Sequence, residues 1–259
     1  MNSSPENEAL MVRLINLLAG SFPAQAILKG GMELRLLNCP RYTNDLDYVF
    51  IPFSSKNDIA APVLEVLGKQ EDLKIQHGMH STCMRVIVSA GKIRVQIELN
   101  VASECKTQEL TTADLARTHH LQGRIIRGMS LDAALAHTLA AWIERGLMRD
   151  LYDIYFIREI LGIAPDLKIL GDRLRKIRCQ RRGKKGPKTM KIAQFAATLR
   201  KAAADIGPAA LREELQDLLD AEELPGLDLK IRKALRTIAE ELDRAGSGGI
   251  PVVSKAGSD

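Results

Sequence analysis

The spacing of apolar residues changes once along the chain, close to residue 128. Before that point helical and strand patterns alternate, with helices predicted over 8–20, 32–37 and 57–70 and strands over 26–28, 45–50, 84–89 and 92–99. Beyond it the apolar runs have the helical period and predict helices over 130–145, 149–161, 166–178, 191–204, 208–221 and 228–244. The sequence therefore predicts an α+β fold, with a mixed α/β core over residues 1–128 and a helical domain over 129–245.

The two ends of the chain carry no such pattern. Residues 1–7 and the tail over 246–259 are expected to be disordered, because the tail sequence GSGGIPVVSKAGSD cannot bury enough surface to hold a shape. Between them, 259 residues with 46% hydrophobic content are enough for one large domain or two small ones.

One predicted strand carries acids where a buried strand would carry apolar residues. Asp45 and Asp47 stand two positions apart, so both side chains point to the same face. Neighbouring carboxylates repel each other, and a divalent cation removes the repulsion because Mg²⁺ prefers oxygen ligands. Glu98 lies on the polar face of the strand over 92–99 and would complete a three-carboxylate cluster if the two strands are neighbours. Such a cluster suits a two-metal phosphoryl-transfer site.

A glycine pair stands between the strand over 26–28 and the helix that follows it. Gly30 and Gly31 would let the backbone approach a phosphate closely, and the next helix would offer its unpaired N–H groups. Taken alone, each motif has a plainer explanation, since two acids on a strand are more often a solvated edge and a glycine pair is usually a turn. The order of the motifs is what favours a nucleotide site.

Two longer motifs point to a known family. Gly30-Gly31-x-x-Leu34-Arg35 is followed by Arg41-x-Thr43-x-Asp45-Leu46-Asp47, and about a hundred residues later comes Arg145-Gly146-x-x-Arg149-Asp150-Leu151-Tyr152-Asp153. Together they resemble the AbiEii/AbiGii family of toxin-type nucleotidyltransferases, in the DNA polymerase β-like superfamily, over roughly residues 26–160. The resemblance implies a polymerase β-like core followed by helices. It also implies catalytic, metal-binding carboxylates at Asp45, Asp47 and Glu98, and nucleotide contacts from Lys29, Gly30, Gly31, Arg41, Thr43, Arg145 and Asp150.

The resemblance also implies an activity. A nucleoside monophosphate would pass from a nucleoside triphosphate to an acceptor hydroxyl, with Mg²⁺ as a two-ion cofactor, in the toxin of a type IV-like toxin–antitoxin or phage-defence pair. In some relatives the acceptor is the 3′ end of tRNA, so RNA and a cognate antitoxin are the expected partners. Two alternatives stay open: a catalytically degenerate RNA- or protein-binding member, or an enzyme that modifies a protein hydroxyl.

One position departs from the family pattern. Members usually carry a lysine eleven residues before the arginine of R-D-L-Y-D, and here that position is Thr138. Arg145 could substitute for it, nucleotide binding could be weaker, or catalysis could be lost. Arg149 and Asp153 have the spacing of an ordinary helical ion pair, which would leave Asp150 for function.

Charge is concentrated in one segment. The net charge is +5, but ten Lys and Arg and no acid lie between Arg173 and Lys191, so the remainder of the chain is mildly acidic. Lysine and arginine neutralise phosphates without reading sequence, which makes Arg181, Arg182, Lys184 and Lys185 candidate RNA contacts. The alternative is a solvated basic loop with no partner.

Other features narrow the class of protein. No apolar run is long enough for a membrane span, and the polar, acidic N-terminus is unlike a signal peptide. The four cysteines are scattered and have no metal-ligand spacing, so we expect a cytoplasmic protein with no membrane partner.

Overall fold

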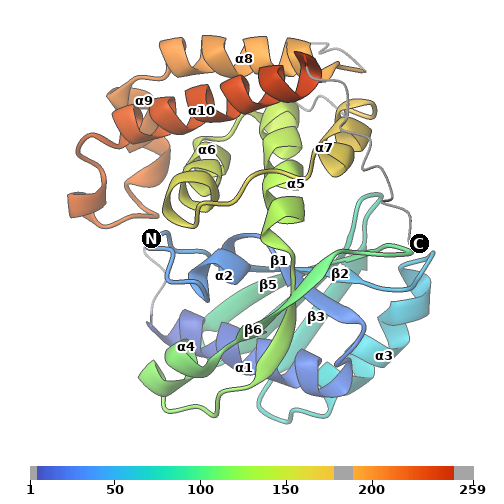
Figure 1. Ribbon diagram of the computed structural model, residues 1–259. Helices are drawn as coiled ribbons and strands as arrows, with labels where there is room; N and C mark the ends of the chain where they lie inside the picture. The colour runs from blue at the N-terminus through green and yellow to red at the C-terminus, as the bar shows by residue number, and fades with distance from the viewer. Residues whose placement is uncertain (1–4, 178–188, 248–259) are drawn as a thin grey trace, which may run out of the picture. The chain divides into compact units, whose positions relative to one another are not determined.

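The computed structural model describes residues 5–177 and 189–247 (Figure 1). The chain forms two compact units, one of Met1–Ala134 with Gln216–Glu223 and the other of Leu135–Leu215 with Leu224–Asp259. The division falls inside a helix, a little beyond the boundary that the sequence suggests, and a short segment from the helical half belongs to the first unit.

The first unit contains a mixed seven-stranded sheet of order β3-β4-β5-β2-β1-β7-β6. Its strands are β1 (Ala26–Lys29), β2 (Asp45–Phe50), β3 (Lys74–Met79), β4 (Met84–Ala90), β5 (Ile93–Val101), β6 (Thr107–Thr111) and β7 (Ile125–Met129). β2 runs parallel to β5 and antiparallel to β1, which in turn runs parallel to β7. The predicted α+β class with a mixed sheet is confirmed.

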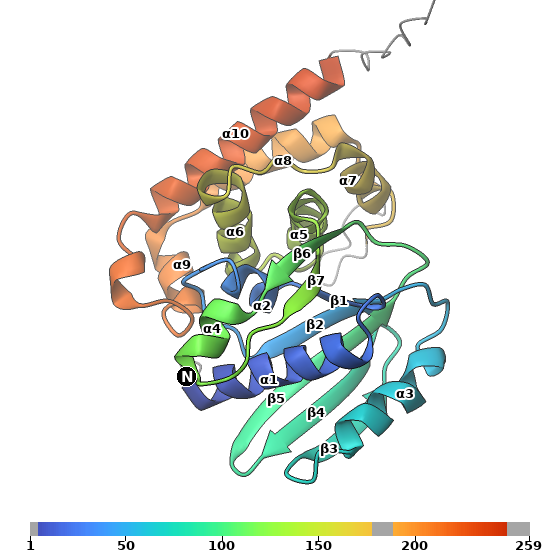
Figure 2. The same ribbon diagram turned by 60° about the horizontal axis from the view of Figure 1, so that its bottom comes forward.

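Two long helices cover one face of this sheet, α1 (Pro5–Ser21) and α3 (Asn57–Gly68), as Figure 2 shows. Apolar side chains from alternate strand positions, such as Leu46, Val86 and Ile97, are fully buried in the core that includes these helices. Because side chains alternate along a strand, the opposite face receives the polar positions of β2, β4 and β5. The fold thereby places Asp45 and Asp47 on the face away from this core.

Some elements differ from the sequence predictions for identifiable reasons. α1 begins at Pro5, inside the stretch predicted to be disordered, because proline fits the first turn of a helix and Glu6 and Glu8 favour its positive end. β3 was missed because it is a mostly exposed strand at the sheet edge, without apolar alternation. β6, β7 and α4 (Ala113–Thr118) were missed because they are short. Asn57 starts α3 rather than capping it, and Lys56 is the N-cap.

A loop over residues 38–44 joins α2 (Gly31–Arg35) to β2 and is braced from two sides. The backbone N–H of Tyr42 donates to the carbonyl of Leu218, 2.8 Å away, in the segment that returns to this unit from far along the chain. The Arg35 guanidinium donates to Glu8 at 2.6 Å and to the carbonyl of Cys39 at 3.1 Å. Arg41 and Thr43 therefore lie on a supported loop.

The second unit is helical throughout its described residues. Its elements are α5 (Leu131–Arg145, which starts in the first unit), α6 (Met148–Tyr155), a π-helical turn (Phe156–Ile160), α7 (Leu167–Leu174), α8 (Ile192–Asp205), α9 (Pro208–Leu215) and α10 (Leu227–Ser247). The 3-10 turn Ala221–Glu223 belongs to the first unit. Asp166 caps α7 by accepting a hydrogen bond from the Ile169 amide at 2.9 Å. The predicted tail loses residues 246 and 247 to α10, and the remainder of it lies outside the described residues. Within the described chain, none of the helices combines the length and apolar character that a membrane crossing needs.

Candidate active site

A row of charged side chains crosses four neighbouring strands on the polar face of the sheet. The strand register places Lys29 of β1 opposite Asp47 of β2, Asp47 beside Glu98 of β5, and Glu98 opposite Arg85 of β4. Two carboxylates thus lie side by side with one cation on each flank. The two strands that carry the acids, β2 and β5, are therefore neighbours in the sheet, as a carboxylate cluster requires.

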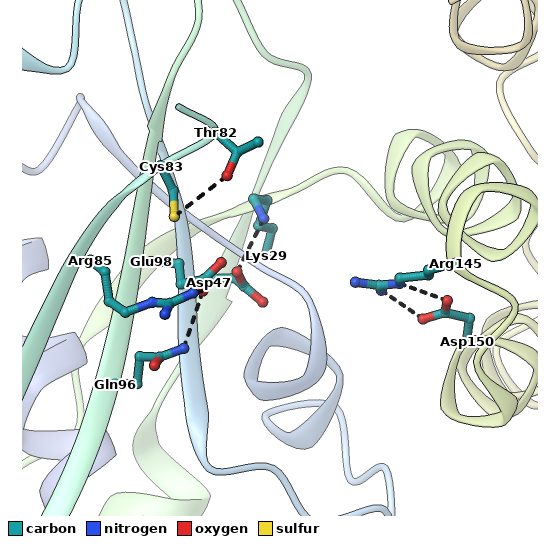
Figure 3. Close-up of polar contacts among 9 residues, drawn as sticks. All are labelled: Lys29, Asp47, Thr82, Cys83, Arg85, Gln96, Glu98, Arg145 and Asp150. Atoms are coloured by element: carbon teal, nitrogen blue, oxygen red, sulfur yellow. Dashed lines mark hydrogen bonds and ion pairs between the residues drawn. The ribbon is translucent and has the colours of Figure 1, made fainter. Parts of the chain in front are cut away.

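Each flanking cation contacts the carboxylate nearest to it (Figure 3). Lys29 Nζ lies 3.4 Å from Asp47 Oδ1, with both side chains about one-third exposed. Arg85 Nη2 donates to Glu98 Oε1 at 2.8 Å, and Gln96 Nε2 donates to the same oxygen at 3.1 Å. The contact at Asp47 is long and partly solvated, so it holds that carboxylate weakly.

The glycine pair sits directly against this row. Gly30 has φ +76° and ψ −152°, a backbone conformation that residues with a side chain rarely adopt. A Cβ at this position would meet Asp47 Oδ2 at 2.9 Å. A Cβ on Gly31 would meet the Arg41 guanidinium at 2.8 Å and Thr43 Oγ1 at 3.0 Å. Both positions therefore need glycine so that the loop side chains and Asp47 can approach the backbone.

Five of the predicted nucleotide contacts are consequently brought together around Asp47. They are Lys29, Gly30, Gly31, Arg41 and Thr43. Arg41 is buried, and its guanidinium donates to the carbonyl of Tyr42 at 3.1 Å. The helix after the glycines has only five residues, so the glycine backbone and the two cations offer more to a phosphate than the helix dipole does.

The three carboxylates fit a metal only in part. No group of three or more His, Cys, Asp or Glu side chains among the described residues is arranged to hold a metal ion. Arg85 and Gln96 instead hold Glu98, and the three-carboxylate metal site stays a prediction. Asp45 and Asp47 on the same face of β2 still supply oxygen ligands of the kind that Mg²⁺ prefers.

The two remaining predicted contacts lie in the second unit, where they bind each other. Arg145 Nε and Nη2 donate to the two oxygens of Asp150 at 2.8 and 2.6 Å, and Asp150 is 1% exposed. Asp150 is thus engaged by Arg145, which the expected pairing of Arg149 with Asp153 did not anticipate. Thr138 lies in α5 of the same unit.

The predicted RNA contacts Arg181, Arg182, Lys184 and Lys185 lie outside the described residues. Three cations from the near side of the same basic segment are described, and acids engage two of them. Arg173 lies 3.2 Å from Glu144, and Arg175 pairs with Asp172. RNA binding by this segment stays a prediction.

The sequence did not indicate two charged residues of the site, Arg85 in the row itself and Glu33 near Lys29. Arg85 could have been found, because it occupies a polar position on a strand that pairs with the strand of Glu98. Glu33 follows the glycines and is completely buried, with Gln108 and the Met129 backbone as the polar groups beside its carboxyl. Burial raises the pKa of Glu33 well above its usual value, and the charge of Lys29 opposes only part of that rise. No sequence pattern distinguishes this glutamate from an exposed one.

Comparison with solved structures supports the fold. MenT4, a nucleotidyltransferase toxin of Mycobacterium tuberculosis, superposes with a TM-score of 0.62 at 15% identity, over 92% of this chain and 86% of that one. JHP933 of Helicobacter pylori gives 0.53 at 16% identity, over 93% and 94%. At these identities the likeness establishes the fold alone.

Sequence comparison establishes the family. No curated protein matches the chain. The family model described as nucleotidyl transferase AbiEii toxin, type IV toxin–antitoxin system, matches residues 14–241, which takes in the glycine pair, both aspartates and Asp150. The chain therefore belongs to the AbiEii nucleotidyl transferase toxin family of type IV toxin–antitoxin systems.

Proposed function

We propose that this protein transfers a nucleoside monophosphate from a nucleoside triphosphate to an acceptor hydroxyl, with RNA, and in particular the 3′ end of tRNA, as the acceptor. The observation that carries the proposal is the gathering of Lys29, Gly30, Gly31, Arg41 and Thr43 around Asp47. This set of groups suits a triphosphate. The ammonium, the guanidinium, the hydroxyl and the glycine backbone can bind phosphate oxygens, and the carboxylate can bind the cation that accompanies them.

Each residue then has a defined role. The glycines let the triphosphate approach the backbone of the β1–α2 turn, while Lys29 and Arg41 neutralise its charge. The acceptor oxygen forms a bond to the α-phosphorus as the bond from that phosphorus to the β-phosphate oxygen breaks, and pyrophosphate leaves with the electron pair. The hydroxyl proton passes to Glu98, whose two hydrogen bonds from the described residues both end on Oε1.

Asp45 and Asp47 would hold Mg²⁺ in this site. When bound, the ion would neutralise the charge that develops on the phosphates and the leaving group. The contact between Lys29 and Asp47 is long enough to be given up when a ligand arrives, since a partly exposed ion pair contributes only about 0–1 kcal/mol.

The test is incubation with each labelled triphosphate, Mg²⁺ and total RNA, followed by a denaturing gel. Label in RNA is the expected result, and it should be absent with Asp45→Asn or Asp47→Asn protein. Label in the protein fraction would instead indicate a protein hydroxyl as the acceptor. Wild-type protein that transfers no label to any acceptor would contradict the proposal.

A second candidate function is a degenerate member that binds but does not react. Thr138 stands where family members usually carry a phosphate-binding lysine, and both carboxylates of the row contact cations. Triphosphate affinity separates the two candidates: binding by wild type that falls with Arg145→Ala and returns with Thr138→Lys favours an enzyme in which the arginine replaced the lysine. Binding by the Thr138→Lys variant alone favours the degenerate protein.

A further inference from the structure

The polar face of the sheet differs on the two sides of the acidic pair. On the β1 side the glycine turn and the loop over residues 38–44 crowd the carboxylates. On the other side, β5, β4 and β3 extend to the sheet edge with solvent-exposed positions on the same face. Arg94 of β5 pairs with Ser89 of β4, and Ser89 pairs with Lys74 of β3, so these three side chains form a second row on that face.

The cations of this second row differ from several other cations of the first unit. Arg13, Lys69 and Arg117 each contact an acid, at 2.5, 2.7 and 3.4 Å. Lys74 and Arg94 are exposed, and neither makes an ion pair or side-chain hydrogen bond with another described residue. Two strand spacings separate them, roughly 10 Å. The open half of the face therefore carries two cations that no acid of the described residues pairs with.

We infer that the open face of β3, β4 and β5 is the docking surface for a single-stranded nucleic-acid acceptor, with Lys74 and Arg94 binding its phosphates. The inference rests on the proposed function. In an in-line displacement the attacking and leaving oxygens lie on opposite sides of the phosphorus. With the triphosphate against the glycine turn, the acceptor approaches across Glu98 and Arg85, and its chain continues over the second row.

The composition of the face also indicates how the acceptor is held. Three rows of facing positions cover it, Gly78–Arg85–Glu98, Gln76–Ile87–Gln96 and Lys74–Ser89–Arg94. No aromatic side chain stands on this face of the three strands, all of which are described, so bases have no stacking platform there. Contacts from lysine and arginine to phosphates carry no base identity, and we expect binding at this surface to be independent of sequence. A protein acceptor would gain nothing from two unneutralised cations unless it were itself acidic.

The test is binding of a short fluorescent single-stranded RNA with a free 3′ hydroxyl, measured by anisotropy at several salt concentrations without nucleotide. The double variant Lys74→Ala/Arg94→Ala should bind at least about ten-fold more weakly at low salt. Its salt slope should fall by about 0.7 for each lost phosphate contact. Arg127→Ala is the matched control, because Arg127 is an exposed strand arginine of the same sheet on β7, beyond β1. It should leave RNA affinity unchanged.

Two kinetic readouts complete the test. In the transfer assay the double variant should raise the KM for RNA and leave the KM for triphosphate unchanged. An RNA affinity and salt slope equal to those of wild type, or an equal loss in Arg127→Ala, would overturn the docking surface. Transfer of label only to protein would overturn it as well. If wild type binds RNA through Lys74 and Arg94 but transfers nothing, the surface stands and the proposed reaction fails.

Discussion

Two aspartates, one in each unit, were both predicted to serve the nucleotide site, and their surroundings differ sharply. Asp47 forms an ion pair with Lys29 at 3.4 Å, between two partly exposed side chains. Asp150 is 1% exposed and is held by Arg145 through two short hydrogen bonds. A loosely held carboxylate can exchange its partner for a ligand at little cost, whereas a buried carboxylate held by a bidentate arginine contributes to the stability of its own unit. The role of an acid that stands out in the sequence therefore depends on the cation that it already contacts in the fold.

The largest expected effect is at Asp47. In the proposed reaction Asp47→Asn should lower transfer by about 10³-fold or more, because it would remove a ligand of the Mg²⁺ and charge at the reacting phosphate. The urea concentration at the midpoint of unfolding should stay close to that of wild type, because the exposed ion pair with Lys29 contributes little to stability. Transfer assays and urea titrations on the same preparation check both parts. Near-normal turnover would remove Asp47 from the site.

The glycine turn offers the next test. Gly30→Ala should cost about 1–3 kcal/mol of stability, because its backbone conformation is almost restricted to glycine. It should also lower turnover by about 10²-fold, since the new Cβ displaces Asp47. Gly68→Ala is the control, because a Cβ there, at the end of α3, would meet nothing within 4 Å. If both variants behave alike, the close approach at Gly30 has no functional meaning.

Asp150→Asn tests whether the carboxylate held by Arg145 serves stability or catalysis. The variant removes the negative charge that the Arg145 guanidinium contacts and should lower the free energy of unfolding by about 1–3 kcal/mol. Circular dichroism melting gives the stability, and transfer at a temperature where the variant is fully folded gives the activity. Residual activity near that of wild type would mark Asp150 as a structural brace. Loss of activity in the folded variant would show that it also serves the nucleotide.

Glu33 adds a third carboxyl, which is completely buried, and its effect should be the smallest. Burial raises its pKa in the folded protein, so above the usual value near 4.5 the unfolded chain releases a proton that the folded protein keeps. Stability is therefore lost as pH rises through this window toward the folded pKa. Glu33→Gln should flatten that slope, and its stability relative to wild type should be greater at pH 8 than at pH 5. Parallel urea titrations at both pH values check this, and an unchanged difference would place the carboxyl in contact with water.

Features that depend on local sequence signals could be predicted, and features that depend on contacts between distant residues could not. β2 was predicted to the residue, because its apolar pattern and the two aspartates are local signals. The polar edge strand β3 was missed because what makes it a strand is its pairing with β4. The glycines, Arg41 and Thr43 were chosen from motif spacing and do lie together. The partners of Glu98 and Asp150 depend on side-chain positions across strands and helices, and no spacing rule supplies those.

The hydrogen bond from Tyr42 to Leu218 has a consequence for the protein during its own synthesis. A ribosome makes the strands, the glycine turn and both aspartates early, and at about 5–20 residues per second it needs several more seconds to reach residue 218. Until then the loop that carries Arg41 and Thr43 lacks one of its two supports. A nascent or prematurely released chain therefore carries the residues of the site without their full scaffold. In a toxin family, this arrangement delays the full support of the loop until residue 218 has been made and folded.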